Sequence, residues 1–96
     1  MKYVIDIDDT ICKEEGPVVG RKPFVNRIEK INKMYDEGHT IVYWSARGSG
    51  SGKDWSEVTK EQFKRYGVKH HTLKFGKPVY DLFIDDKNIN SEAYFK

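Results

Sequence analysis

One stretch near the N-terminus decides the fold of this chain: Tyr3-Val4-Ile5-Asp6-Ile7-Asp8-Asp9-Thr10. Its apolar, β-branched residues are typical of a buried strand, but carboxylates interrupt the run and end it. A buried carboxylate is costly unless a cation or a hydrogen-bond donor compensates its charge. The acids at this strand end therefore indicate a functional site.

Two later stretches also place a polar group at the end of an apolar run: Ile41-Val42-Tyr43-Trp44-Ser45 and Tyr80-Asp81-Leu82-Phe83-Ile84-Asp85-Asp86. In an open parallel sheet the carboxyl ends of the strands lie at one edge, where ligands bind. We therefore expect three strands that bring Asp6, Ser45 and Asp85 to a single site.

Two helices and a short strand are expected between these runs. The first helix follows Pro23, and its apolar residues recur at helical spacing, at Phe24, Ile28, Ile31 and Tyr35. The second spans residues 55–66, with Asp54 and Glu57 as an aspartate-led capping box. Gly38 and Gly67 are expected to end the two helices. A strand over residues 71–75 precedes the last run. This alternation predicts an α/β fold, a minimal Rossmann-like three-layer sandwich with a mostly parallel sheet. The C-terminal tail is expected to form a short helix or turn.

Length and composition limit the remaining possibilities. With 96 residues, the chain forms one domain, residues 1–96, and has no room for a cap domain. A net charge of +2, with basic and acidic residues interspersed, gives no strong signal for nucleic-acid binding. Cys12 is the only cysteine, so no internal disulfide can form. No leader and no apolar run of about 18 residues is visible, so we expect a cytoplasmic protein without membrane contact.

Four motifs in this order resemble those of the haloacid dehalogenase-like (HAD) superfamily. Asp6-Ile7-Asp8-Asp9-Thr10 resembles the first motif, Ser45 the second, Lys77 the third and Asp85-Asp86 the fourth. Three segments are similar to small capless phosphatases of capsule-polysaccharide biosynthesis: Trp44-Ser45-Ala46-Arg47-Gly48, Phe75-Gly76-Lys77-Pro78 and Tyr80-Asp81-Leu82-Phe83-Ile84-Asp85-Asp86-Lys87.

The resemblance implies a phosphomonoesterase that depends on Mg²⁺. Asp6 is then the nucleophile that forms an aspartyl-phosphate, and Asp8 is the general acid and base. Ser45 and Lys77 are expected to hold the phosphoryl oxygens. Lys74 is a rival for the lysine, because Lys77 lies only eight residues before Asp85.

The resemblance also implies a set of metal and substrate ligands. Mg²⁺ takes oxygen ligands, here the Asp6 and Asp85 side chains and the Asp8 backbone carbonyl, with Asp86 binding directly or through water. Thr10, which is also expected to fix its turn, and Arg47 are candidate substrate-binding residues, although a solvent-exposed Arg47 fits the sequence equally well. Asp9 is expected to be structural.

Other readings fit the sequence less well. A receiver domain has its acidic pair after the first strand, and a P-loop needs a glycine where this chain has Arg47. A polynucleotide 3′-phosphatase would use the same catalytic residues, but no basic, aromatic stripe for a nucleic-acid strand is visible. A catalytically silent HAD-like binding module is the other alternative. We expect a small phosphosugar or related metabolite as the substrate.

The HAD superfamily usually carries a cap domain in one of two connections. Here neither the connection after the first strand nor the one from Phe75 to Tyr80 is long enough to hold one. Residues 10–22 form a flap, and residues 47–52, rich in glycine and serine, are expected to form a mobile loop beside the site. Water must then be excluded by the flap, by this loop, by the substrate or by a neighbouring subunit. A homo-oligomer is therefore a hypothesis that follows from the sequence.

Overall fold

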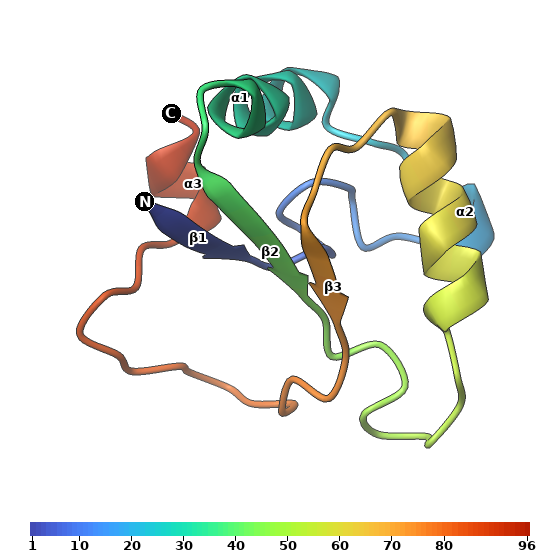
Figure 1. Cartoon of the computed structure of the whole chain (residues 1–96). Coiled ribbons are helices and arrows are strands. Elements are labelled where there is room, and N and C mark those ends of the chain that lie inside the picture. Colours follow the sequence, from blue (N-terminus) through green and yellow to red (C-terminus); the bar gives the residue numbers. More distant parts are fainter.

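The computed structural model describes all residues, 1–96, as an open sheet with helices against it (Figure 1). Its elements, in chain order, are β1 (Lys2–Ile5), a 3-10 turn η1 (Val18–Gly20), α1 (Val25–Asp36), β2 (Thr40–Trp44), α2 (Ser56–Tyr66), β3 (Thr72–Lys74) and α3 (Ser91–Tyr94). The three strands lie in the order β1-β2-β3, and both pairs are parallel. The predicted α/β class and the parallel sheet are confirmed.

The core lies on one face of the sheet. Strand residues alternate between the two faces, so Tyr3 and Ile5 of β1 share a face with their β2 partners Ile41 and Tyr43. The core cluster joins this face to α1 through Ile28, Ile31 and Met34 and to α2 through Phe63. Both long helices therefore cover the same face, and the opposite face, with Val4 60% exposed, carries no helix. The third layer that we expected is not present.

The helix boundaries follow local signals. α1 begins two residues after Pro23, and Gly38 (φ 96°) lies just beyond its end in the left-handed region that favours glycine. Gly67 (φ 69°) ends α2 in the same way. The expected capping box of α2 is wrong, because the Asp54 carboxylate accepts the Ser56 N–H at 2.9 Å in a local turn and so does not cap the helix from the N-cap position.

The predicted strand over residues 80–86 does not form. These residues are irregular, and their apolar side chains face solvent, with Leu82 76% and Ile84 88% exposed. The Lys77 N–H donates to the Ser45 carbonyl at 3.1 Å, which places the chain across the carboxyl end of β2. A parallel strand must begin at the opposite end of the sheet, so the next residues start in the wrong place to continue it.

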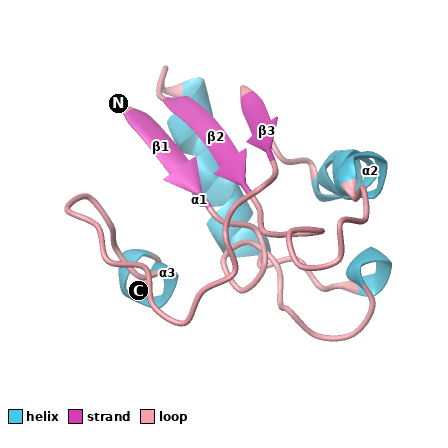
Figure 2. Cartoon of the chain, turned by 90° about the horizontal axis from the view of Figure 1, so that it is seen from below, coloured by secondary structure: helices cyan, strands magenta, loops and turns pink.

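The C-terminal tail forms the expected short helix. α3 lies on the β1 side of the molecule, while α2 lies beyond β3 (Figure 2). The Arg27 guanidinium of α1 is 3.0 Å from Glu92, and the Lys30 ammonium lies 4.6 Å from the centre of the Tyr94 ring. α3 therefore packs on α1 through its aromatic side chains and charged contacts.

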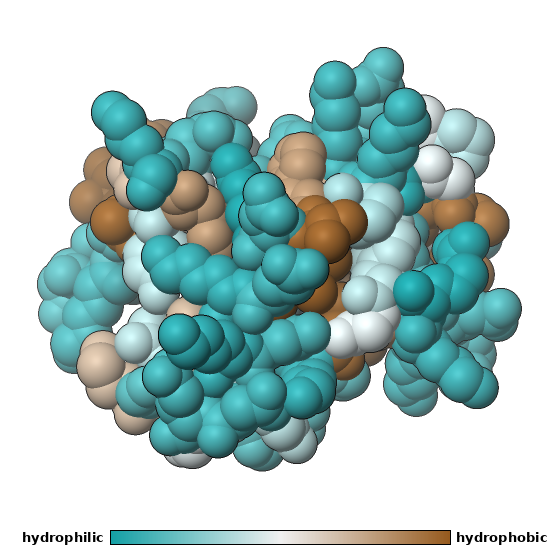
Figure 3. All heavy atoms as spheres, turned by 90° about the horizontal axis from the view of Figure 1, so that it is seen from above, coloured by the Kyte–Doolittle hydropathy of each residue, from teal (hydrophilic) through white to brown (hydrophobic).

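The surface seen from above is mainly hydrophilic, with hydrophobic side chains in separate patches (Figure 3). None of the helices combines the length and the apolar character that crossing a bilayer requires.

Candidate functional site

A carboxylate and an ammonium group meet at the carboxyl end of the sheet. Asp6 follows β1 directly, and its Oδ1 lies 3.4 Å from the Lys77 Nζ, with 36% of the Asp6 side chain and 13% of the Lys77 side chain exposed. Burial raises the pKa of Asp6, and the positive charge of Lys77 opposes this rise. Lys77 is thus the lysine beside the predicted nucleophile, whereas Lys74 is exposed on β3.

The Gly-Ser loop helps to hold Lys77 in this place. The Ser49 hydroxyl donates to the Lys77 carbonyl at 2.7 Å, and the Ser49 N–H donates to the Ala46 carbonyl at 3.0 Å. The Gly52 N–H donates to the Gly48 carbonyl at 2.7 Å. The loop over residues 47–52 therefore contains defined turns, and one of its side chains fixes the backbone of Lys77.

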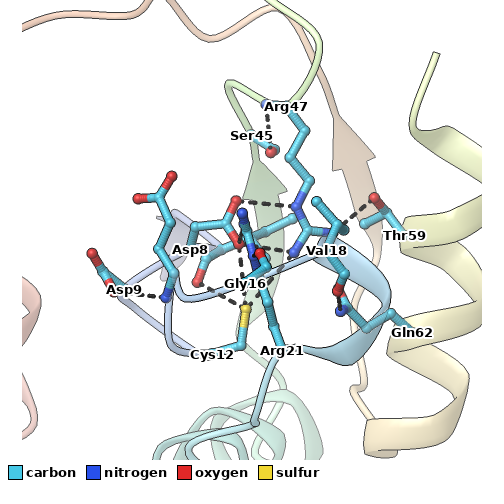
Figure 4. A network of polar contacts seen from close by, with 12 residues as sticks. Asp8, Asp9, Cys12, Gly16, Val18, Arg21, Ser45, Arg47, Thr59 and Gln62 are labelled. Atoms are coloured by element: carbon cyan, nitrogen blue, oxygen red, sulfur yellow. Dashed lines mark hydrogen bonds and ion pairs between the residues drawn. The ribbon is translucent and has the colours of Figure 1, made fainter. Parts of the chain in front are cut away.

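Asp8 lies between two arginines (Figure 4), and we call Asp8, Arg21 and Arg47 the arginine–aspartate cluster. The Arg47 Nε and Nη2 donate to the two Asp8 carboxylate oxygens at 3.0 and 2.9 Å, and the Arg21 Nη1 lies 2.6 Å from Oδ1. Burial raises the pKa of Asp8, but the hydrogen bonds and charges of Arg47 and then Arg21 outweigh burial and lower it. Asp8 is therefore held as a carboxylate.

Arg47 is fixed by this contact. Its side chain is 3% exposed, and its remaining guanidinium nitrogen, Nη1, donates to the Thr59 hydroxyl of α2 at 2.9 Å. Of the two alternatives that the sequence left open for Arg47, solvent exposure is wrong, and the guanidinium donates to Asp8 and Thr59. The buried Asp8 carboxylate is the physical reason, since it needs a compensating cation within reach.

Arg21 is the site residue that the sequence did not reveal. Three α2 side chains, Gln62, Arg65 and Tyr66, donate to the backbone carbonyls of Val18, Val19 and Arg21 and so hold the flap against the site. The Arg21 Nε also donates to the Gly16 carbonyl at 3.4 Å. Lys13 and Lys22 occur in the same flap, so no sequence signal distinguished Arg21 from its basic neighbours.

The remaining first-motif and second-motif residues lie in turns. Ser45 is buried, and its hydroxyl accepts the Arg47 N–H at 3.0 Å, so it fixes the backbone after β2. Asp9 (φ 61°) accepts the Glu14 N–H at 2.9 Å, which confirms its structural role. The Thr10 N–H donates to the Ile7 carbonyl at 3.1 Å, which places Thr10 in the turn after β1.

The predicted metal ligands do not come together. Asp85 and Asp86 are exposed in the irregular segment, where the Asp86 N–H donates to the Asp85 carboxylate at 2.8 Å. No group of three histidine, cysteine or acidic side chains lies close enough to hold a metal ion. At the site itself, Asp8 is engaged by the arginines and Asp6 by Lys77. We therefore derive no step of the reaction through Mg²⁺.

A cavity of about 440 Å³ joins the two ion-paired carboxylates. Its wall includes three acids, three basic residues and two large aromatic residues: Asp6, Asp8, Glu14, Arg21, Arg47, Lys77, Trp55 and Tyr80. A second cavity of about 490 Å³ reaches Asp6 from the free edge of β1. The first cavity thus exposes both the nucleophile candidate, Asp6, and the arginine–aspartate cluster to one space.

Comparisons with known proteins identify the fold alone. No family model and no curated protein matches this chain. A crystal structure of a structural-genomics target from Vibrio cholerae matches with a TM-score of 0.87 and 21% sequence identity, over 98% of this chain and 86% of that one. The α/β architecture described above, including the path of almost the whole chain, is therefore similar to that of an experimentally determined structure.

Proposed function

We propose that this protein hydrolyses phosphate monoesters through an aspartyl-phosphate intermediate. The observation that carries the proposal is the pairing of a partly exposed carboxylate, Asp6, with the Lys77 ammonium at 3.4 Å on the wall of a cavity. A carboxylate nucleophile needs a nearby cation, because it must approach a phosphoryl group that is itself anionic. The resemblance of the four motifs to the HAD superfamily supports the same assignment.

The reaction has two displacements at phosphorus. In the first, an Asp6 carboxylate oxygen attacks phosphorus, the ester P–O bond breaks, and the leaving oxygen takes a proton from Asp8 and departs as the alcohol. In the second, water attacks the phosphorus of the aspartyl-phosphate, the bond to Asp6 breaks, and inorganic phosphate leaves. The Lys77 ammonium, 3.4 Å from Asp6, is proposed to offset the charge of the phosphoryl oxygens in both steps.

Asp8 is the proposed general base for the second step. Its lowered pKa keeps it ionised at neutral pH, so it is ready to take the proton of the attacking water in the second step. Protonating the leaving alcohol in the first step requires Asp8 to carry a proton, which Arg21 and Arg47 oppose. We therefore expect formation of the phosphoenzyme to be slower than its hydrolysis.

We propose that the reaction depends on Mg²⁺, and this part of the proposal rests only on the resemblance of the four motifs to the HAD superfamily. A divalent cation would neutralise charge on the phosphoryl oxygens. Asp85, Asp86, Asp6 and the Asp8 carbonyl remain the proposed ligands, although the arrangement described above does not assemble them.

A small phosphosugar is the substrate class that we propose. A cavity of about 440 Å³ suits a metabolite, and Trp55 and Tyr80 on its wall offer aromatic surface to a sugar ring. No feature of the described residues favours a polynucleotide strand. The Ser45 hydroxyl, which already accepts the Arg47 N–H, is proposed to act by fixing the loop after β2.

The test is an assay of phosphate release from phosphosugars, nucleotides and a 3′-phosphorylated oligonucleotide, with Mg²⁺ and with EDTA. We expect release from phosphosugars with Mg²⁺ and its loss in Asp6→Asn. Release from the oligonucleotide alone would favour the polynucleotide phosphatase, and no release from any compound would favour the silent binding module.

A further inference from the structure

We propose that Arg21 binds a second anionic group on the leaving group of the substrate, either a carboxylate or a second phosphate. This inference rests on the proposed function and narrows its substrates to sugar phosphates that carry another negative charge. It follows from the unequal way in which the two arginines of the arginine–aspartate cluster are used.

All three guanidinium nitrogens of Arg47 already donate hydrogen bonds within the protein. Two of its guanidinium nitrogens donate to the Asp8 carboxylate, and the third donates to the Thr59 hydroxyl. This bidentate geometry is the one in which arginine and a carboxylate pair best. Asp8 therefore has a full counterion without Arg21.

Arg21 keeps hydrogen-bonding capacity. Its Nη1 contacts an Asp8 oxygen that Arg47 also contacts, and its Nε makes a long bond of 3.4 Å to the Gly16 carbonyl. Its Nη2 has no hydrogen-bond partner in the protein, although only 13% of the side chain is exposed. A half-satisfied guanidinium on the wall of a cavity is suited to an anionic ligand.

The position of Arg21 assigns it to the leaving group. Lys77 and Asp6 define the end of the cavity where the phosphoryl group is transferred. Arg21 lines the same cavity and contacts Asp8, the residue that exchanges a proton with the leaving oxygen in the proposed reaction. An anion that meets Arg21 must therefore be carried by the alcohol part of the ester.

The other residues of this wall suit a sugar. Glu14 lies on the same wall and pairs with no cation, so its oxygens are available to accept hydrogen bonds from hydroxyl groups. Trp55 and Tyr80 supply aromatic surface. The hydroxyl groups of a sugar ring can donate hydrogen bonds to Glu14, and one further anionic substituent can accept them from Arg21.

The flap holds Arg21 in place before any ligand binds. Gln62, Arg65 and Tyr66 of α2 donate to three flap carbonyls, including the one of Arg21 itself. Because the backbone is already fixed, little conformational entropy is lost on binding. Each of these bonds ends on the backbone, so none of them occupies the Nη2 nitrogen of Arg21, which remains available to a ligand.

The experiment compares three substrates that differ in the charge of the leaving group: glucose 6-phosphate, 6-phosphogluconate and fructose 1,6-bisphosphate. We expect the wild type to prefer one or both of the compounds with a second anion. Arg21→Met should raise KM for a preferred compound by about 10- to 100-fold, as expected for a lost charged hydrogen bond. KM for glucose 6-phosphate should change by less than about threefold, since no charged contact is lost.

Arg65→Met is the matched control, because Arg65 holds the flap at the Val19 carbonyl without lining the cavity. It should leave the ratio of KM values between substrates unchanged. Comparing ratios removes any effect that Arg21→Met has through Asp8, since such an effect is common to all three substrates.

The outcomes separate the two proposals. Hydrolysis of all three substrates without preference, an equal loss on all three in Arg21→Met, or the same loss of preference in Arg65→Met would overturn the role of Arg21 and leave the phosphatase intact. No hydrolysis of any phosphomonoester would overturn the proposed function. In that case calorimetric binding of 6-phosphogluconate, lost in Arg21→Met and kept in Arg65→Met, would still support the anion contact, and equal binding by both variants would overturn it.

Discussion

Arg47 and Asp8, 39 residues apart in the chain, form a two-point contact, with Nε and Nη2 of the arginine 3.0 and 2.9 Å from the two carboxylate oxygens. The pair links the loop after β1 to the loop after β2, at the end of the sheet where Asp6 also lies. Such a pair orients the carboxylate and keeps it ionised, so Arg47 is a positioning residue for Asp8.

Removing this contact should weaken the fold. Arg47→Met leaves a largely buried Asp8 carboxylate with Arg21 as its remaining cation, so we expect a loss of about 3 kcal/mol in the free energy of unfolding. Urea denaturation measures this loss. Arg65→Met, which removes an exposed arginine, should change the free energy by less than about 0.5 kcal/mol. Equal stability of the two variants would show that the buried pair does not support the fold.

The two first-motif acids should have separable roles. Asp6→Asn should abolish both turnover and the phosphoenzyme, because an amide cannot form the acyl-phosphate bond. Asp8→Asn should slow hydrolysis of the intermediate and allow it to accumulate, since the base that activates water is lost. Acid quenching with a ³²P-labelled substrate measures the intermediate. Asp36→Asn, at the far end of α1, is the control and should keep wild-type turnover. Full activity in Asp6→Asn would contradict the mechanism.

The pH dependence of kcat/KM should reflect the ionisation of the Asp6 carboxylate. Burial raises the pKa of Asp6, and only the ionised carboxylate is a nucleophile, so kcat/KM should fall as the pH drops through this raised pKa. Asp8 has a lowered pKa and stays ionised over that range. Lys77→Met removes the charge that opposes the burial effect, so the acid limb should move to higher pH. A limb that stays in place or moves to lower pH would show that Lys77 does not act on Asp6.

Two glycines in the same loop should respond differently to alanine. Gly48 has φ 81°, and a Cβ atom there would lie 2.1 Å from the Lys53 carbonyl oxygen, whereas a Cβ at Gly50 meets nothing within 4 Å. Gly48→Ala should lower the free energy of unfolding by about 1–3 kcal/mol. It should also lower kcat, because the neighbouring Ser49 hydroxyl holds the Lys77 carbonyl. Gly50→Ala is the control, and an equal effect of both changes in thermal unfolding and kcat would contradict the role of this turn.

Metal dependence tests the fourth motif. We expect EDTA to abolish phosphate release, Mg²⁺ to restore it, and Asp85→Asn to raise the Mg²⁺ concentration needed for half-maximal activity. Calorimetric titration of Mg²⁺ into the wild type and Asp85→Asn gives a readout that does not depend on turnover. Asp36→Asn should titrate like the wild type. Identical titrations of all three proteins would mean that Asp85 is not a ligand.

The sequence predicted local structure well where one residue type has one strong preference. Glycine ended α1 and α2 as expected, because Gly38 and Gly67 take a left-handed conformation that other residues adopt at a cost. The apolar runs at residues 3–5 and 41–44 identified strands β1 and β2, since β-branched and aromatic residues favour strands. The segment over residues 80–86 has an equally apolar pattern, yet it forms no strand, because its starting point depends on where Lys77 crosses the sheet.

The sequence by itself therefore determined the parallel α/β fold and the placement of Asp6, Asp8 and Ser45 after the first two strands, because these follow from short-range patterns. Only the tertiary structure decided that Lys77 and not Lys74 lies beside Asp6, that Arg47 is buried, and that Arg21 reaches Asp8 from the flap. A charged side chain on a loop has no periodicity. Its partner is selected by distance and burial, which exist only once the chain has folded.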